Sequence, residues 1–219
     1  MRRSANVLVT GKKESGKTTL ARELLRHTRR AVVLDRLGHD YPEVPAADTF
    51  EEFAGAYRHV RGDPAFQLRL TDHRTGAHLA AMRLVSRLQE REELPPVGLF
   101  MEEASFYSST GDLPDVVDAV SSKGRHWRIS TVVVTQRATQ VHPLLFDNSD
   151  LVVTFRLRSF PQKIRELWPR EELEEIKRLE EIGPDDYRHG PPVPVKGTHY
   201  LVDPPEVDVL ERWREAAPC

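Results

Sequence analysis

Hydrophobic residues along this chain fall into short continuous runs that alternate with stretches of helical spacing. Six segments carry the continuous or alternating apolar residues expected of strands: 5–10, 31–35, 65–71, 97–101, 130–136 and 150–158. Four segments between them space their apolar residues three or four apart, as helices do: 17–27, 48–60, 77–92 and 113–124. Because strands that alternate with helices form parallel sheets, the pattern predicts an α/β fold, a mostly parallel sheet flanked by helices on both faces.

The pattern changes after about residue 160. Helical spacing predicts helices at 160–168 and 170–182, Pro and Gly punctuate a loop at 183–197, and an edge strand at 198–203 precedes a last helix at 206–217. A chain of 219 residues favours one domain. We therefore expect a single domain over 1–219, with a core at about 5–165 and an extension at about 166–219.

Composition narrows the class of protein further. No apolar run approaches 18 residues, so no intrinsic membrane span is expected. The single cysteine, Cys219, cannot form an internal disulfide, and this favours a reducing compartment. The net charge of −2 gives no global basic signal for nucleic acid.

A phosphate-loop motif lies between the first strand and the first helix. The residues Gly11 to Thr18 match G-x-x-x-x-G-K-[ST], and their strand–loop–helix position is the one that the motif requires. The backbone N–H groups of such a loop and the helix dipole bind phosphate, Lys17 reaches the β- and γ-phosphates, and Thr18 binds Mg²⁺. The residues expected to bind ATP are Gly11, Lys12, Lys13, Glu14, Ser15, Gly16, Lys17, Thr18 and Thr19.

Two acidic residues, Glu102 and Glu103, follow the apolar strand at 97–101. The first carboxylate is expected to hold the Mg²⁺ shell, and the second to act as general base on the attacking water. Tandem acids after a phosphate loop favour ATP hydrolysis. The alternative interpretation is two exposed acids that open a loop.

Two further side chains are candidates for catalysis. Gln136 ends the apolar segment at 130–136. In an ATPase sheet this strand commonly lies between the phosphate-loop strand and the Glu-Glu strand, so the Gln136 amide could contact both the water and the γ-phosphate. Arg125 precedes that strand and could reach the γ-phosphate of a neighbouring subunit. The alternatives are a polar residue that closes a strand, and a surface arginine that, with Arg128 and Arg137, contacts DNA phosphates.

Three blocks in order, GKKESGKTTL (11–20), LFMEEASF (99–106) and SKGRHWRISTVVVTQRATQVHPLLFDNSDLVVTFRLR (122–158), resemble the FtsK–HerA group of P-loop ATPases. The short chain is similar to the small genome-packaging ATPases of tailless icosahedral viruses with an internal membrane. The resemblance covers roughly residues 5–165 and implies a RecA-like (ASCE) P-loop NTPase fold. It also implies Lys17 and Thr18 as phosphate and magnesium contacts, Glu103 as base and Gln136 as sensor, whereas Glu102 stands where the family more often has Asp.

The resemblance further implies an ATP- and Mg²⁺-dependent translocase that forms a homo-oligomeric ring, a pentamer or hexamer, around double-stranded DNA. A viral packaging motor would work in the host cell cytoplasm, in association with the virion or procapsid, and would dock on a capsid vertex or a membrane-associated viral protein. The segment that follows Glu103, with Phe106 and Tyr107, is either a mobile loop that couples nucleotide state to DNA or an ordinary loop whose aromatics pack on the core.

Three other functions compete with this interpretation. A plasmid-transfer or conjugation ATPase of the same superfamily would share every motif above. A small-molecule kinase shares the phosphate loop but needs a substrate lid with arginines. The segment at 159–190 could be such a lid, but its acidic stretch at 171–181 would repel phosphates. A GTP-dependent switch ranks lowest, because the guanine-reading sequence Asn-Lys-x-Asp is absent.

Overall fold

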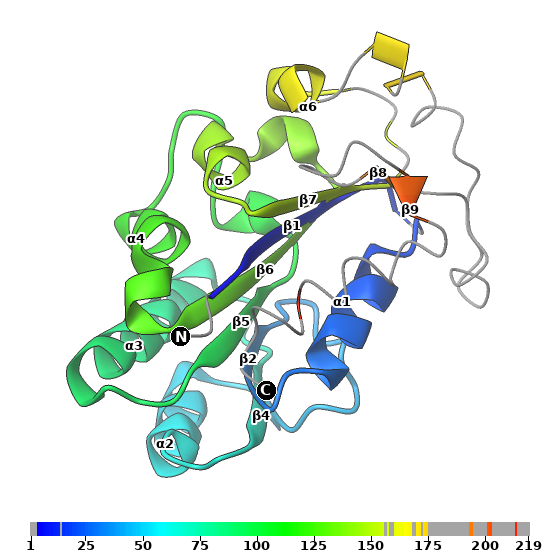
Figure 1. Cartoon of the computed structure of the whole chain (residues 1–219). Coiled ribbons are helices and arrows are strands. Elements are labelled where there is room, and N and C mark those ends of the chain that lie inside the picture. Colours follow the sequence, from blue (N-terminus) through cyan, green and yellow to red (C-terminus); the bar gives the residue numbers. More distant parts are fainter. Residues whose placement is uncertain are drawn as a thin grey trace.

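A seven-stranded sheet forms the centre of the molecule in this computed structural model, which describes residues 4–13, 15–155, 157, 160–167, 170–171, 173–174, 193–194, 201–202 and 213. Its strands are β1 (Asn6–Thr10), β2 (Arg30–Leu34), β3 (Ala46–Ala47), β4 (Phe66–Leu70), β5 (Val97–Met101), β6 (Ile129–Thr135) and β7 (Leu151–Thr154). They lie in the order β3-β4-β2-β5-β6-β1-β7, and every pair is parallel. This confirms the predicted α/β fold (Figure 1).

The strand order brings the predicted site segments to one edge of the sheet. β6 lies between β5 and β1, as expected for an ATPase sheet. Thr10 at the end of β1 is paired with Thr135 of β6 and Thr154 of β7, and Leu34 of β2 with Met101 of β5. Since parallel strands end at the same edge, the loops that follow β1, β2, β5 and β6 meet there.

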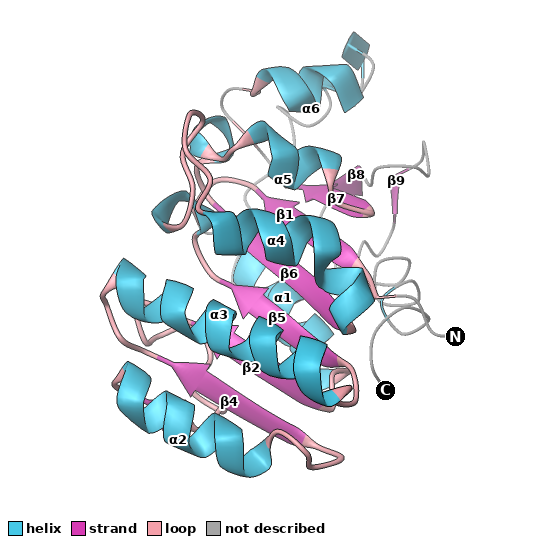
Figure 2. Cartoon of the chain, turned by 90° about the vertical axis from the view of Figure 1, so that its left-hand side faces the viewer, coloured by secondary structure: helices cyan, strands magenta, loops and turns pink. Residues whose placement is uncertain are grey.

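Helices cover both faces of the sheet. The helices are α1 (Lys17–Arg26), α2 (Phe50–Val60), α3 (Thr75–Glu92), α4 (Asp115–Lys123), α5 (Pro143–Asp147) and α6 (Gln162–Leu167), with 3-10 turns η1 (Ala104–Phe106), η2 (Gly124–Trp127) and η3 (Ala138–Gln140). Figure 2 shows α2, α3 and α4 in front of the sheet and α1 behind it. The strands are buried on both faces, and this explains why their sequences read as continuous apolar runs.

Each face has its own hydrophobic core. On the face of α2–α4, Phe53, Val85 and Val117 pack over the sheet. On the α1 face, Leu20 and Leu24 belong to a second cluster that also holds Trp213.

Trp213 is fully buried, donates a hydrogen bond from Nε1 to Thr28 Oγ1 at 3.0 Å, and meets the Phe100 ring edge-on at 6.0 Å. One residue of the predicted extension therefore packs in the core. The expectation that residues 1–219 form a single domain stays a prediction.

The elements that follow residue 160 differ in part from expectation. α6 confirms the predicted helix at 160–168. Leu201 and Val202 form β9 (Leu201–Val202), which pairs antiparallel with β8 (Val193–Pro194) in a separate two-stranded sheet. The expected edge strand therefore pairs with part of the expected loop. Most of 170–182 and 206–217 lies outside the described residues, and no described helix combines the length and apolar character needed to cross a bilayer.

Candidate active site

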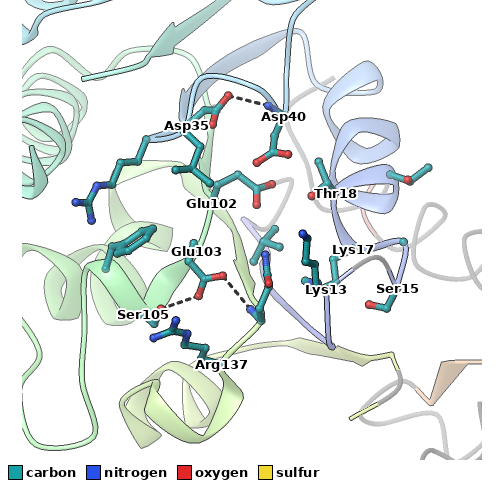
Figure 3. A pocket seen from close by; sticks show the side chains of 17 residues that line it. Lys13, Ser15, Lys17, Thr18, Asp35, Asp40, Glu102, Glu103, Ser105 and Arg137 are labelled. Atoms are coloured by element: carbon teal, nitrogen blue, oxygen red, sulfur yellow. Dashed lines mark hydrogen bonds between the residues drawn. The ribbon is translucent and has the colours of Figure 1, made fainter. Parts of the chain in front are cut away.

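A cavity of about 570 Å³ opens at the carboxyl edge of the sheet. Its walls come from the start of α1, the loop after β2, and the residues that follow β5 and β6. Figure 3 shows the acids Glu102 and Asp40 on one side of it, facing Thr18 from α1. The predicted phosphate loop and the predicted acids thus line a single cavity.

The phosphate loop has the geometry of an anion cradle. Gly16 adopts φ 93°, a left-handed conformation that favours glycine. A Cβ on Gly11 would lie 2.6 Å from Phe155 Cβ and 2.7 Å from Ser15 Oγ, so the tight turn needs a glycine there too. The Ser15 hydroxyl is buried and has no hydrogen-bond partner among the described residues. Such an orphaned polar atom in the cradle fits a phosphate oxygen.

Lys17 occupies the first turn of α1 and is almost completely buried. Its ammonium donates to the carbonyl oxygen of Lys12 at 2.6 Å. Burial lowers the pKa of Lys17 to about 8, although the carboxylates of Glu102, Glu103 and Asp40 oppose this shift. A nucleotide's phosphates would supply the negative charge that this buried ammonium lacks.

Glu102 follows β5 directly and is buried. Burial raises the pKa of its carboxyl to about 8, and the nearby acids Asp40 and Asp35 add to the shift. The Tyr41 hydroxyl donates to Glu102 Oε1. A hydroxyl from Thr18 and this carboxylate are oxygen ligands of the kind Mg²⁺ prefers, so the residues present fit that ion.

Glu103 lies beside Gln136. The backbone N–H of Gln136 donates to Glu103 Oε2 at 3.2 Å, while Oε1 accepts from Ser105 Oγ at 2.6 Å and from Thr135 Oγ1 at 3.2 Å. Glu103 itself adopts φ 50°, which is uncommon for a residue other than glycine. Backbone strain of this kind is concentrated at functional sites.

The other predicted residues differ in their relation to the cavity. Lys13 and Thr19 line the cavity, whereas Lys12 contributes its carbonyl to Lys17. Glu14 lies outside the described residues. Arg125 lies in η2 at the opposite, amino edge of the sheet, where it forms an ion pair with Asp150. The structure does not bring Arg125 to the cavity of its own subunit.

Sequence reasoning missed the loop that follows β2. Asp35 is fully buried, pairs with Arg69 at 3.2 Å, and accepts the backbone N–H groups of Gly38 and Asp40 at 3.0 and 3.1 Å. This holds Asp40 at the wall of the cavity, which Arg36 also lines. The available signal was the position of Asp35 directly after a buried strand, where ligand-binding residues collect in parallel sheets.

The segment that follows Glu103 places its two aromatic side chains differently, and the expected coupling of a mobile loop to DNA stays a prediction. Tyr107 is buried and its hydroxyl bonds His78 Nδ1 at 2.6 Å, whereas Phe106 is exposed and lines the cavity. One aromatic side chain therefore packs on the core, and the other faces the site.

No protein-family model and no curated protein matches the sequence. Among solved structures, the chain is similar to the genome packaging NTPase B204 from Sulfolobus turreted icosahedral virus 2 in complex with AMP, with 18% identity, a TM-score of 0.66, and coverage of 92% of this chain and 97% of that one. B204 from Sulfolobus turreted icosahedral virus, a DNA-packaging ATPase, matches with 15% identity and a TM-score of 0.60, over 91% of this chain and 100% of that one. EssC (ATPases 2 and 3) from Geobacillus thermodenitrificans matches with 11% identity and a TM-score of 0.50, over 96% of this chain and 43% of that one. At these identities the likeness shows a shared P-loop NTPase fold.

Proposed function

We propose that this protein hydrolyses Mg-ATP to move double-stranded DNA, as a genome-packaging motor. The observation that carries the proposal is the convergence of Glu103 and Gln136 on the cavity that begins at the phosphate loop. The similarity over 92% of the chain to B204, which is described as a genome packaging NTPase, supports the packaging role.

Each residue has a defined task in this proposal. Lys17 binds the phosphate tail, and Thr18 and Glu102 hold Mg²⁺, which when bound neutralises developing charge on the phosphates. Glu103 takes a proton from the attacking water while the water oxygen bonds to the γ-phosphorus and the bond to the bridging oxygen of ADP breaks. Gln136 contacts that water and the γ-phosphate.

The assembly belongs to the same proposal. We place Arg125 at a subunit boundary of a homo-oligomeric ring, where its exposed guanidinium reaches the γ-phosphate of the neighbour. Double-stranded DNA passes through the centre of this ring. The protein works in the host cell cytoplasm, where the ring docks on a capsid vertex or a membrane-associated viral protein.

A pair of variants tests the hydrolysis. With purified protein, ATP and Mg²⁺, we expect steady phosphate release without any acceptor, and faster release with duplex DNA. Lys17→Ala should lose ATP binding in titration calorimetry, whereas Glu103→Gln should bind ATP but turn over about 10²–10⁴-fold more slowly, because only the base is lost.

The DNA part has a separate measurement. The affinity of the protein for duplex DNA should fall steeply as the salt concentration rises, because contacts with DNA phosphates release counterions. A salt-independent duplex affinity would contradict the translocase, and undiminished ATP binding by Lys17→Ala would contradict the nucleotide site.

A further inference from the structure

One side-chain hydrogen bond at the site joins the loop that follows β2 to the acid that follows β5. The Tyr41 hydroxyl donates to Glu102 Oε1, and among the described residues no other hydrogen bond or ion pair involves the Glu102 carboxylate. Figure 3 shows this carboxylate turned toward the side of the cavity where Thr18 lies. Tyr41 thus occupies one oxygen of Glu102 and leaves Oε2 for the cavity.

Tyr41 is a rigid partner, because its side chain is completely buried. It belongs to the hydrophobic cluster of the α1 face, together with Leu20 and Phe100. Its backbone carbonyl oxygen accepts the N–H of Val44 at 3.1 Å. A tyrosine side chain has only two torsions that place its ring, and close packing in a core fixes both. The core therefore sets the position of the Tyr41 hydroxyl.

The loop that carries Tyr41 is itself held in place by β4. Gly38 adopts φ 72°, and its carbonyl oxygen accepts from Arg69 Nη1 at 3.2 Å. The same nitrogen pairs with Asp35, whose carboxylate also accepts the backbone N–H groups of Gly38 and Asp40. The turn that leads into Tyr41 is therefore fixed by hydrogen bonds before the tyrosine enters the core.

Glu102 needs such a partner, because its own backbone does not fix its carboxylate. The Glu102 N–H donates to the carbonyl oxygen of Leu34 at 3.1 Å, so its backbone is held against β2. Three rotatable bonds separate that backbone from the carboxylate oxygens, and free rotation about them would spread the oxygens over many positions. A hydrogen bond from a fixed hydroxyl removes most of this freedom.

From these contacts we infer that Tyr41 is a positioning residue, which fixes the Glu102 carboxylate so that Oε2 binds the divalent cation of the nucleotide. Tyr41 contacts neither the cation nor the nucleotide and acts only through Glu102. A hydrogen-bond partner of this kind orients a metal ligand, and its loss typically lowers metal affinity about 10–100-fold. This inference rests on the proposed function, because it concerns the Mg²⁺ site of the same hydrolysis reaction.

Tyr41→Phe tests this role, because it removes the hydroxyl and keeps the buried ring. The probe is AMPPCP, an ATP analogue with carbon in place of the oxygen that bridges the β- and γ-phosphates, and titration calorimetry measures its affinity with Mg²⁺ and with EDTA. We expect Tyr41→Phe to lower the affinity with Mg²⁺ about tenfold and to leave the affinity in EDTA unchanged. A merely structural role would weaken binding equally in both conditions and would overturn the inference.

Tyr57→Phe is the matched control. Tyr57 is also completely buried, but it lies in α2, and its hydroxyl has no hydrogen-bond partner among the described residues. Loss of this hydroxyl should therefore change neither affinity.

Glu102→Asp provides a second test, in a double-mutant cycle with Tyr41→Phe. An aspartate is shorter by one methylene, so its carboxylate loses the contact with Tyr41. In the Glu102→Asp background, Tyr41→Phe should then lower the affinity with Mg²⁺ by less than about twofold, because the two substitutions remove the same interaction. A tenfold loss in that background would overturn the inference.

The wild-type protein separates this inference from the proposed function. If wild type does not bind AMPPCP, or gains no affinity from Mg²⁺, the proposed function itself fails. If wild type gains affinity from Mg²⁺ and Tyr41→Phe keeps the whole gain, only the role of Tyr41 fails.

Discussion

The two edges of the sheet place their unbonded polar groups in different surroundings. At the carboxyl edge, the buried hydroxyls of Thr10, Ser15 and Thr154 have no hydrogen-bond partner among the described residues. Glu102 lies nearby with a raised pKa, and Glu103 has a left-handed backbone. This edge therefore keeps polar capacity that the described residues do not use.

At the amino edge, several polar groups bond one another, although the buried Tyr57 hydroxyl and Gln89 Oε1 have no hydrogen-bond partner among the described residues. The Asn6 amide nitrogen donates to the carbonyls of Ser121 and Asn148, at 2.8 and 3.1 Å, and its oxygen accepts from Thr131 Oγ1 at 2.8 Å. The Arg30 guanidinium is likewise spread over three backbone carbonyl oxygens: Arg61, Asp63 and Pro96. These bonds join β1, β2 and β6 to α4 and to the segments that follow α2, α3 and α5.

The difference shows which part of the molecule is built for stability and which for binding. Buried polar groups that lack partners lower stability, so they persist where a ligand completes them. Both edges hold such groups, but at the carboxyl edge Ser15 and Glu103 line the cavity, whereas Gln89 at the amino edge does not. Three predictions test this division, beginning with the largest effect.

Arg125 is the one predicted catalytic residue on the amino edge. A catalytic role for it would contradict the assignment of that edge to stability alone. In a homo-oligomer we expect Arg125→Ala to lower ATP turnover about 10³-fold, as the loss of an arginine finger does. Its ion pair with Asp150 is exposed, so the free energy of unfolding should fall by less than about 1 kcal/mol. Chemical denaturation and phosphate release measure the two quantities.

Mixed assemblies separate action in trans from local damage. Subunits with Arg125→Ala retain an intact phosphate loop, and subunits with Lys17→Ala retain the arginine, so a mixture should exceed both parents in turnover. Arg91→Ala, at an exposed arginine in the last turn of α3, is the control that should change neither quantity. A mixture no better than its parents would argue that Arg125 has no catalytic contact with a neighbour.

The pH dependence of the free energy of unfolding tests the state of Glu102 at the carboxyl edge. Its carboxyl has a pKa of about 8 in the folded protein against an ordinary 4.5. Between those values the folded state keeps a proton that the unfolded chain releases, so the free energy of unfolding falls as pH rises through the window. From pH 5 to 8, wild type without metal and nucleotide should lose about 2–4 kcal/mol relative to Glu102→Gln.

The pH series should stop near 8. Lys17 has a pKa of about 8 in the folded protein against 10.5 in an unfolded chain. Above pH 8 its titration therefore raises the free energy of unfolding with pH, which opposes the effect of Glu102. Denaturant titrations at several pH values provide the measurement. Parallel curves for wild type and variant would mean that Glu102 is charged in the folded protein throughout.

The local parts of this site could be predicted from sequence, and the long-range parts could not. The phosphate loop is defined by residue spacing within one strand–loop–helix unit, and Glu102 and Glu103 by their position after an apolar run. Tyr41 could not be assigned, because its bond to Glu102 joins residues 61 apart and depends on the adjacency of β2 and β5. Ser105 was missed for another reason, since its bond to Glu103 depends on a rotamer and no pattern of residue types encodes that.

The amino edge offers the smallest and most direct test. Asn6→Ala leaves two carbonyls and the Thr131 hydroxyl without their partner, which should lower the free energy of unfolding by about 2 kcal/mol. For a chain of this size that is a fall of about 4–8 °C in the thermal midpoint. Turnover per folded molecule should not change, because Asn6 lies at the far end of β1 from the cavity. Ser15→Ala is the matched substitution at the carboxyl edge, where the hydroxyl has no partner to lose, so it should leave the midpoint within about 1 °C and weaken ATP binding. Equal destabilisation by the two variants would show that the edges do not differ in the way their polar groups are used.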